Sequence, residues 1–192
     1  MRIAEMERVT AEVDIKLKLN IDGEGKSKVK TGIKFLNHML VTLAKHAYWN
    51  LEVKASGDLA HHIIEDVGLV LGEAFRKALK EKLGIRRFGY AFVPMDDSLA
   101  RAAVDLGGRP YTYLEMELKG LEIEGTKVED IEHFIFSLGQ ALKANIHLSV
   151  LYGSNDHHKV EAAIKALAVA FREASTIDER IEKEKPSAKG IL

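Results

Sequence analysis

The stretch His61-His-Ile-Ile-Glu65 returns as His157-His-Lys-Val-Glu161, so that one pattern, HHxxE, occurs twice in the chain. The two copies are 96 residues apart in a chain of 192 residues. The likeness continues downstream, where Phe75-Arg-Lys-Ala78 returns as Phe171-Arg-Glu-Ala174 at the same offset. Self-similarity at a fixed offset is the signature of internal duplication. The sequence therefore predicts two similar halves.

A lone histidine precedes each copy of the pattern. His38 lies in the first half, and His133 follows 95 residues later in the second half. Between the lone histidine and HHxxE, each half has a helical stretch and then an extended run. Each half thus carries the same order of histidine, helix, strand and double histidine.

The hydrophobic pattern around these motifs predicts strands and helices in alternation. Residues 13–21 alternate apolar and polar side chains, as a half-buried strand does. Residues 35–47 and 61–82 carry helical stripes of apolar side chains, and strands are expected at 99–106 and 111–118. Strands followed by helices, twice, predict an α+β fold with helices stacked between sheets.

The fold prediction is two sheet-and-helix halves of βαβ type, which arose by internal duplication and are related by a pseudo-twofold axis. We expect the first half to span residues 1–85 and the second 86–180. Residues 181–192 are expected to form a tail after a charged run, and to contribute to the substrate site.

Composition narrows the class of protein. Apolar residues make up 46% of the chain, the usual share for a globular core, and the net charge is −1. This charge balance favours neither nucleic acid nor an anionic membrane. The chain has no cysteine, so disulfides and thiolate metal sites are excluded. The first residues lack an apolar signal segment and no apolar run is long enough to span a membrane, so a cytoplasmic protein is expected.

The HHxxE spacing points to metal ions. Residues four apart lie on one face of a helix, so His61 with Glu65, and His157 with Glu161, can each hold one ion. His62 and His158 point about 100° round the helix from these, towards a different ion. If the halves face each other, the first ion takes His61, Glu65, His133 and His158, and the second takes His157, Glu161, His38 and His62. Manganese, iron and zinc all suit such ligands.

Other functions fit parts of this pattern. A single histidine is more often a residue that satisfies local hydrogen bonds, but six in a duplicated pattern favour metal. A dinuclear hydrolase would use the ions to make hydroxide from water. A non-catalytic module that binds RNA is a further alternative, although no basic stripe with interleaved aromatic residues is present.

The order of motifs along nearly the whole chain resembles the imidazoleglycerol-phosphate dehydratase family of histidine biosynthesis. The segments that carry the resemblance are Thr31–Leu40, His61–Asp66, Arg87–Gly89, Asp105–Tyr111, Val128–Phe134, Asn155–Lys159 and Pro186–Gly190. This resemblance implies a hydro-lyase that converts D-erythro-imidazole glycerol phosphate to imidazole acetol phosphate and water. It also implies a fold like domain 2 of ribosomal protein S5, two Mn²⁺ ions per active site, and a 24-mer assembled from trimers with active sites between subunits.

The resemblance also assigns roles to residues. It implies that Glu12 is the catalytic base and that His46 contacts the substrate or assists proton transfer. The substrate contacts that it implies are Glu12, His46, Arg87, Arg109, Lys165, Ser187 and Lys189. Arginine suits phosphate because its guanidinium binds two oxygens at once.

The reaction explains why two ions are needed. No carbonyl neighbours the carbon that loses its proton, so electrons must first be withdrawn by the imidazole ring. Two metal ions on the ring nitrogens would stabilise an imidazolate. That ring would expel the adjacent hydroxyl and leave a diazafulvene-like intermediate, from which a carboxylate takes the proton.

Three positions depart from the family pattern. Asn37 stands where aspartate is frequent, the segment 57–61 before the double histidine is short, and Ala188 replaces a frequent serine. No expected metal ligand is missing.

Overall fold

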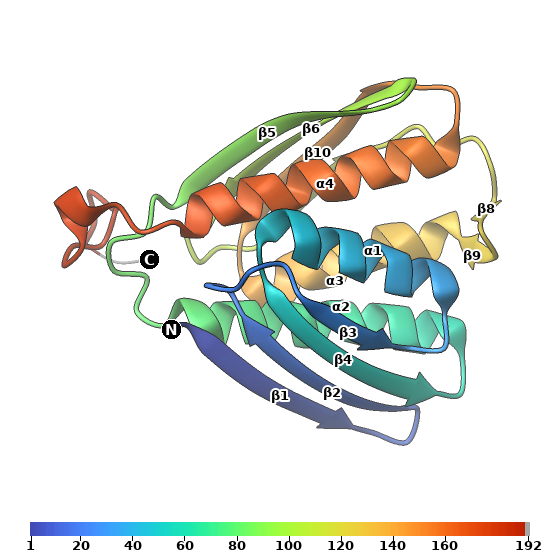
Figure 1. Cartoon of the computed structure of the whole chain (residues 1–192), viewed down its shortest axis with the longest axis horizontal. Helices are drawn as coiled ribbons and strands as arrows, with labels where there is room; N and C mark the ends of the chain where they lie inside the picture. Colours follow the sequence, from blue (N-terminus) through green and yellow to red (C-terminus); the bar gives the residue numbers. More distant parts are fainter. Residues whose placement is uncertain (191–192) are drawn as a thin grey trace.

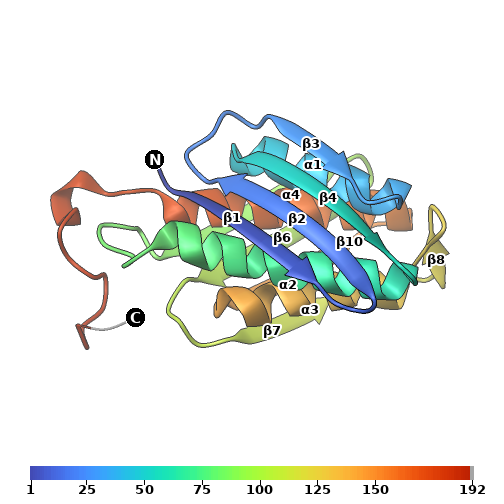
Figure 2. The same ribbon diagram turned by 90° about the horizontal axis from the view of Figure 1, so that it is seen from below.

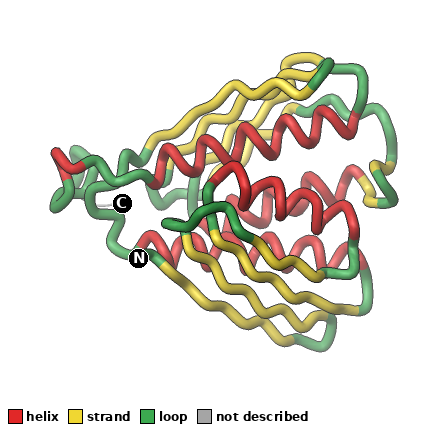
Figure 3. The backbone as a smooth tube through the Cα atoms, in the orientation of Figure 1, coloured by secondary structure: helices red, strands yellow, loops and turns green. Residues whose placement is uncertain are grey.

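Four long helices lie between two four-stranded sheets in the computed structural model, which describes residues 1–190 (Figure 1, Figure 3). The prediction of an α+β fold with helices between sheets is therefore confirmed. The division at residues 85 and 180 stays a prediction. Of the tail, Ile191 and Leu192 lie outside the described residues.

The two halves repeat one topology. The first contains β1 (Ile3–Val9), β2 (Val13–Asn20), β3 (Ser27–Lys30), α1 (Lys34–Ala47), β4 (Asn50–Gly57) and α2 (Ala60–Leu79). The second contains β5 (Phe88–Met95), β6 (Ser98–Asp105), β7 (Tyr111–Glu115), α3 (Val128–Leu142), β10 (Asn145–Tyr152) and α4 (Asp156–Ser175). Small elements of the second half are β8 (Glu122–Ile123), β9 (Thr126–Lys127) and the 3₁₀ turn η1 (Glu179–Ile181).

The strand orders confirm the duplication. They are β1-β2-β4-β3 and β5-β6-β10-β7, so each half places its fourth strand between its second and third. The last pair of each order is parallel, β4 with β3 in the first sheet and β10 with β7 in the second. The other pairs are antiparallel. Even the helix ends repeat, since Tyr48 after α1 and Lys143 after α3 both adopt the left-handed conformation, with φ of 57° and 55°.

Local sequence explains the elements. In β2 the side chains of Val13, Ile15, Leu17 and Leu19 are buried and alternate with exposed ones, as the period-two pattern predicts. The helix predicted over 61–82 ends at Leu79, because Lys80 has φ 52° and leaves the helical conformation.

The helices of one half pack on those of the other. Helix α2 packs against α3 and α1 against α4, as Figure 1 and Figure 2 show. Glycine makes the α2–α3 contact close, because a Cβ atom added at Gly72 would lie 2.5 Å from the carbonyl oxygen of Leu138. An aromatic cluster of Trp49, Phe75 and Phe171, with ring centroids 4.7–5.8 Å apart, joins the halves in the core. The packing of helices between the halves brings the lone histidine of each half close to the HHxxE motif of the other half.

No helix within residues 1–190 is long and apolar enough to cross a membrane.

Candidate metal centres

Within residues 1–190, two clusters of side chains that could bind metal form where the helices of one half pack on those of the other. One contains His38, His157 and Glu161, and the other His61, Glu65 and His133. The candidate ligand atoms within each cluster lie within 4.8 Å of one another. The cluster at His38 joins α1 to α4, and the cluster at His61 joins α2 to α3, so each draws on both halves. Three of the four ligands predicted for each ion are thus brought together within one chain.

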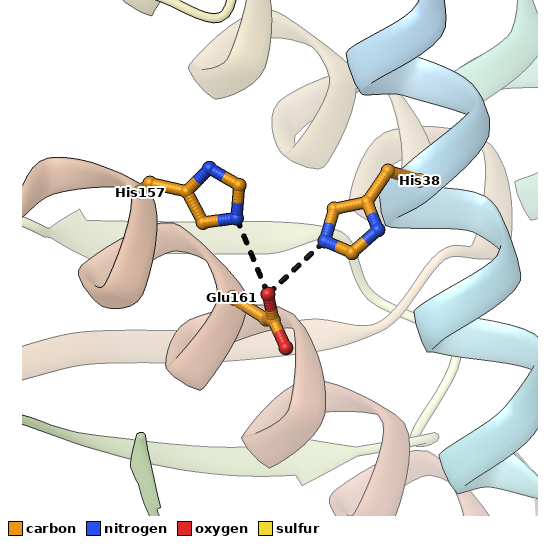
Figure 4. A group of neighbouring side chains, drawn as sticks. All are labelled: His38, His157 and Glu161. Carbon is orange, nitrogen blue, oxygen red and sulfur yellow. Dashed lines mark hydrogen bonds and ion pairs between the residues drawn. The ribbon is translucent and has the colours of Figure 1, made fainter. Parts of the chain in front are cut away.

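The cluster at Glu161 is centred on that carboxylate (Figure 4). Its Oε2 lies 3.0 Å from Nε2 of His38 and 3.3 Å from Nε2 of His157. Its Oε1 lies 2.7 Å from Nζ of Lys165, one helical turn further along α4. Burial alone would raise the pKa of Glu161, but hydrogen bonds from Lys165 and His38 lower it to about 2. The carboxylate is therefore ionised at neutral pH, as a metal ligand must be.

The cluster at His61 is more open. Nε2 of His61 lies 3.6 Å from Oε2 of Glu65, and both side chains are 40% exposed. The ring centroids of His61 and His133 are 5.1 Å apart. Nδ1 of His61 lies on the other side of the ring, 2.6 Å from Oδ1 of Asp130. Imidazole nitrogen and carboxylate oxygen without sulfur form a donor set that fits a divalent first-row metal ion.

His62 and His158 belong to neither cluster within one chain, although they were predicted as the fourth ligands. Nδ1 of His62 lies 2.8 Å from Asp58, and Nδ1 of His158 lies 2.6 Å from Asp97. The hydrogen bond to Asp58 raises the pKa of His62. Hydrogen bonds from Ser154 and His158 hold the pKa of Asp97 well below its ordinary value. Each ring is therefore oriented by a carboxylate at one nitrogen.

The proposed base and two substrate contacts lie towards these clusters. Glu12, in the turn between β1 and β2, has Oε2 4.0 Å from Nδ1 of His62. Lys165 contacts Glu161 as described. His46 lies two helical turns along α1 from His38, and burial lowers its pKa.

The expected phosphate contacts lie at the other end of the molecule. The backbone N–H of Arg87 donates to the carbonyl of Ala174 near the C-terminus of α4, 17 residues from His157. At 1.5 Å per residue, this places Arg87 about 26 Å from the ligand end of α4. Arg109 follows β6, whose last residue pairs with Phe88 next to Arg87.

The tail is held at the same end. The Arg87 guanidinium donates to Pro186 O at 3.0 Å and to both carboxylate oxygens of Asp105. Ser187 Oγ accepts a hydrogen bond from the N–H of Lys189 at 3.2 Å. Ser187 and Lys189 therefore lie near Arg87 and far from either ligand cluster of their own chain.

The sequence did not reveal the carboxylates that orient the histidine rings. Asp58, Asp97 and Asp130 come from a loop before α2, a turn before β6 and the first turn of α3. An acidic residue near a histidine motif is the signal that could have found Asp58 and Asp130. Asp66, which follows the first HHxxE, makes an ion pair with Arg8 and, within residues 1–190, belongs to neither cluster.

Two of the departures from the family pattern have local roles. The side chain of Asn37 accepts hydrogen bonds from the N–H and hydroxyl of Thr31, which fixes the start of α1. The short segment before the double histidine supplies Asp58. A hollow of about 1030 Å³ on the first sheet is lined mainly by lysine, glutamate and apolar residues and by no histidine, so it is not the metal centre.

Known proteins are similar to this chain in sequence and in fold. The family model for imidazoleglycerol-phosphate dehydratase matches residues 31–171. The imidazoleglycerol-phosphate dehydratases of Methanothermobacter thermautotrophicus and Thermoanaerobacter pseudethanolicus are 52% and 47% identical, over all of this chain and 98% and 100% of theirs.

Solved structures agree with these sequence matches. The enzyme from Staphylococcus aureus superposes with a TM-score of 0.85 at 32% identity, over 92% of this chain and 99% of that one. The enzyme from Pyrococcus furiosus, in complex with (S)-C348, gives 0.84 at 39% identity over 97% and 100%.

Proposed function

The chain belongs to the imidazoleglycerol-phosphate dehydratase family of hydro-lyases, and from this premise we propose its reaction, its metal and its assembly. It removes water from D-erythro-imidazole glycerol phosphate and gives imidazole acetol phosphate, a step in L-histidine biosynthesis. It does so with two Mn²⁺ ions per active site. The observation that carries the proposal is the pair of ligand clusters, each built from both halves of the duplicated chain.

The proposed ligands of each ion are those that the sequence predicts, but the fourth ligand of each comes from another copy of the chain. One ion is held by His61, Glu65 and His133 of one chain, and the other by His157, Glu161 and His38. The fourth ligands are His158 and His62 of further copies of the chain. This assignment is supported by the orientation of the two rings, because Asp97 and Asp58 engage Nδ1 of His158 and His62, which makes Nε2 the nitrogen for a metal ion. Nε2 of His158 faces an exposed carboxylate, Asp96, at 3.5 Å, beyond the distance of a short hydrogen bond.

The position of the phosphate contacts also supports active sites between subunits. Arg87, Arg109, Ser187 and Lys189 lie about 26 Å along α4 from the ligand end. A substrate with three carbons between imidazole and phosphate is much shorter than this. A homo-oligomer, a 24-mer in the proposal, brings the phosphate end of one chain to the metal end of another.

The chain's own residues divide the remaining chemistry. When bound, the two ions supply Lewis acidity that withdraws electrons from the imidazole ring. Glu12 takes the proton from the carbon next to the one that loses its hydroxyl. His46, a half-buried ring whose pKa is lowered by burial, contacts the substrate. Lys165 holds Glu161 in place and adds positive charge for the phosphate.

Metal exchange tests the proposal. The protein is stripped of metal with a chelator under anaerobic conditions, reloaded with Mn²⁺, Zn²⁺ or Fe²⁺, and assayed for formation of imidazole acetol phosphate. We expect turnover with Mn²⁺. An inactive Mn²⁺-loaded protein would refute the assignment.

The role of Glu12 has its own test. Glu12→Gln keeps the size of the side chain and is expected to bind metal and substrate as the wild type does, with turnover about 10²–10⁴-fold lower. Glu7→Gln, on the exposed face of β1, is the matched control and should keep full turnover. Retained turnover in Glu12→Gln would reject Glu12 as the base.

A further inference from the structure

Asp130 is a buried acid beside the cluster at His61. It lies in the first turn of α3, and its side chain is 6% exposed. Its Oδ1 lies 2.6 Å from Nδ1 of His61, on the neighbouring helix α2. A buried carboxylate is costly unless it is hydrogen-bonded, and here the partner is this imidazole.

The contact fixes the proton of the ring. A carboxylate oxygen at 2.6 Å accepts a hydrogen bond, so Nδ1 of His61 carries the proton and donates it. In the neutral imidazole, Nε2 then holds the lone pair. Nε2 is the nitrogen that faces Glu65, at 3.6 Å from its Oε2. The carboxylate therefore selects the tautomer that a metal ion needs at this position.

The same contact fixes the direction of the ring. Asp130 and His133 are one turn apart on α3, and His61 and Glu65 are one turn apart on α2. The Asp130–His61 hydrogen bond crosses between the two helices on the side of the ring away from Glu65. The three ligands are thereby held together by the packing of α2 on α3.

We propose that Asp130 is a positioning residue, which orients His61 and so pre-organises the His61, Glu65 and His133 site before an ion binds. This inference rests on the proposed function, since it takes these three residues as ligands. Carboxylates that hold the second nitrogen of a ligand histidine typically contribute 10–100-fold to metal affinity.

The other site is built differently. Nδ1 of His157 lies 3.3 Å from Glu124, whose side chain is 62% exposed. Its carboxylate ligand, Glu161, is already engaged by Lys165 at 2.7 Å. A surface carboxylate at this longer distance restrains the ring less than a buried one at 2.6 Å. The two sites are therefore unequal, and loss of Asp130 should affect one of them.

The test is Asp130→Asn in the full-length protein, with Mn²⁺ binding measured by competition with a chelating indicator. We expect the wild type to bind two ions per chain. The variant should bind one of them with about 10–100-fold lower affinity and the other with unchanged affinity. Glu129→Gln, on the exposed side of the same helical turn, is the matched control and should bind as the wild type does.

Nitrogen NMR reports the tautomer of His61, which a purely structural role of Asp130 would not set. With ¹⁵N-labelled histidine in the metal-free wild type, the signal of His61, assigned by its loss in His61→Gln, should show a protonated Nδ1 and a bare Nε2. If Asp130→Asn does not fold, Asp130→Leu supplies an apolar side chain of similar size for the binding measurement.

Each outcome decides one claim. A wild type that binds no Mn²⁺ overturns the proposed function. If the wild type binds two ions and Asp130→Asn binds both as tightly as the wild type does, the role of Asp130 is overturned. The same holds if the variant loses affinity equally at both sites. A wild-type His61 with its proton on Nε2 overturns it as well.

Discussion

Hybrid oligomers test whether one active site uses two chains. Glu12 lies at the metal end, beside His62, and Arg109 lies at the end where α4 finishes. The two ends of α4, at His157 and Ala174, are about 26 Å apart by the rise of that helix. Arg109 is exposed, and within residues 1–190 its guanidinium makes no ion pair or hydrogen bond, so Arg109→Ala should leave the fold intact. Glu12→Gln and Arg109→Ala are each expected to be nearly inactive alone. Co-expression with two different tags, followed by purification on both, yields mixed oligomers.

The expected activities follow from counting sites. If Glu12 and Arg109 of one active site come from different chains in a random equal mixture, each is intact in half of the sites. Turnover should then recover to about a quarter of the wild-type value. If both come from the same chain, the hybrid stays inactive. The control mixes wild type with the double variant, which gives about a quarter in the first case and about a half in the second.

The assay is the rate of imidazole acetol phosphate formation at saturating substrate and Mn²⁺, per total chain. An inactive hybrid of the single variants, together with about half activity in the control mixture, would refute the two-chain site. In that case the tail and Arg109 would have to reach the metal end of their own chain.

Three further predictions concern stability. Phe171→Ala removes an aromatic ring from the core cluster and should lower the free energy of unfolding by about 3–5 kcal/mol in a denaturant titration. Gly72→Ala should destabilise the protein by about 1–3 kcal/mol despite the better helix propensity of alanine, because the new methyl meets Leu138 O. Burial would raise the pKa of Asp22, but hydrogen bonds from Arg2 and its charge lower that pKa below its ordinary value. The ion pair therefore stabilises the fold above pH 3.8, and this stabilisation is lost as the pH falls through the pKa of Asp22 in the folded protein. Asp22→Asn should therefore cost up to about 1 kcal/mol at pH 7, and this difference should vanish on acidification.

Each of these changes has a surface control. Phe136→Ala on the exposed side of α3, Arg76→Ala on α2 and Asp14→Asn on β2 should each change the free energy of unfolding by less than about 0.5 kcal/mol. An unfolding free energy of Gly72→Ala equal to or above the wild-type value would mean that the α2–α3 contact is looser than described. A pH-independent effect of Asp22→Asn would show that the ion pair is not its cause.

The repeat, the fold class and the identity of the candidate ligands could be predicted from the sequence. These depend on short-range rules: a period of two in β2, helical stripes in α2 and α4, and the four-residue spacing of HHxxE. Three strands, β1, β3 and β5, lie outside the segments for which the sequence pattern predicts strands. In β5 the exposed positions are Phe88, Tyr90 and Phe92, so the strand lacks the polar alternation that marks a half-buried strand.

The folded chain brings together the two groups of three ligands that the sequence predicts, but the place of His62 and His158 follows from the tertiary structure. The pairing of α2 with α3 and of α1 with α4 places His133 beside His61 and His38 beside Glu161, and it leaves His62 and His158 outside both clusters. Helix pairing depends on side-chain packing across long sequence separations, such as the close contact at Gly72, and no local pattern encodes it. For the same reason, the sequence alone did not reveal Asp130 as the partner of His61.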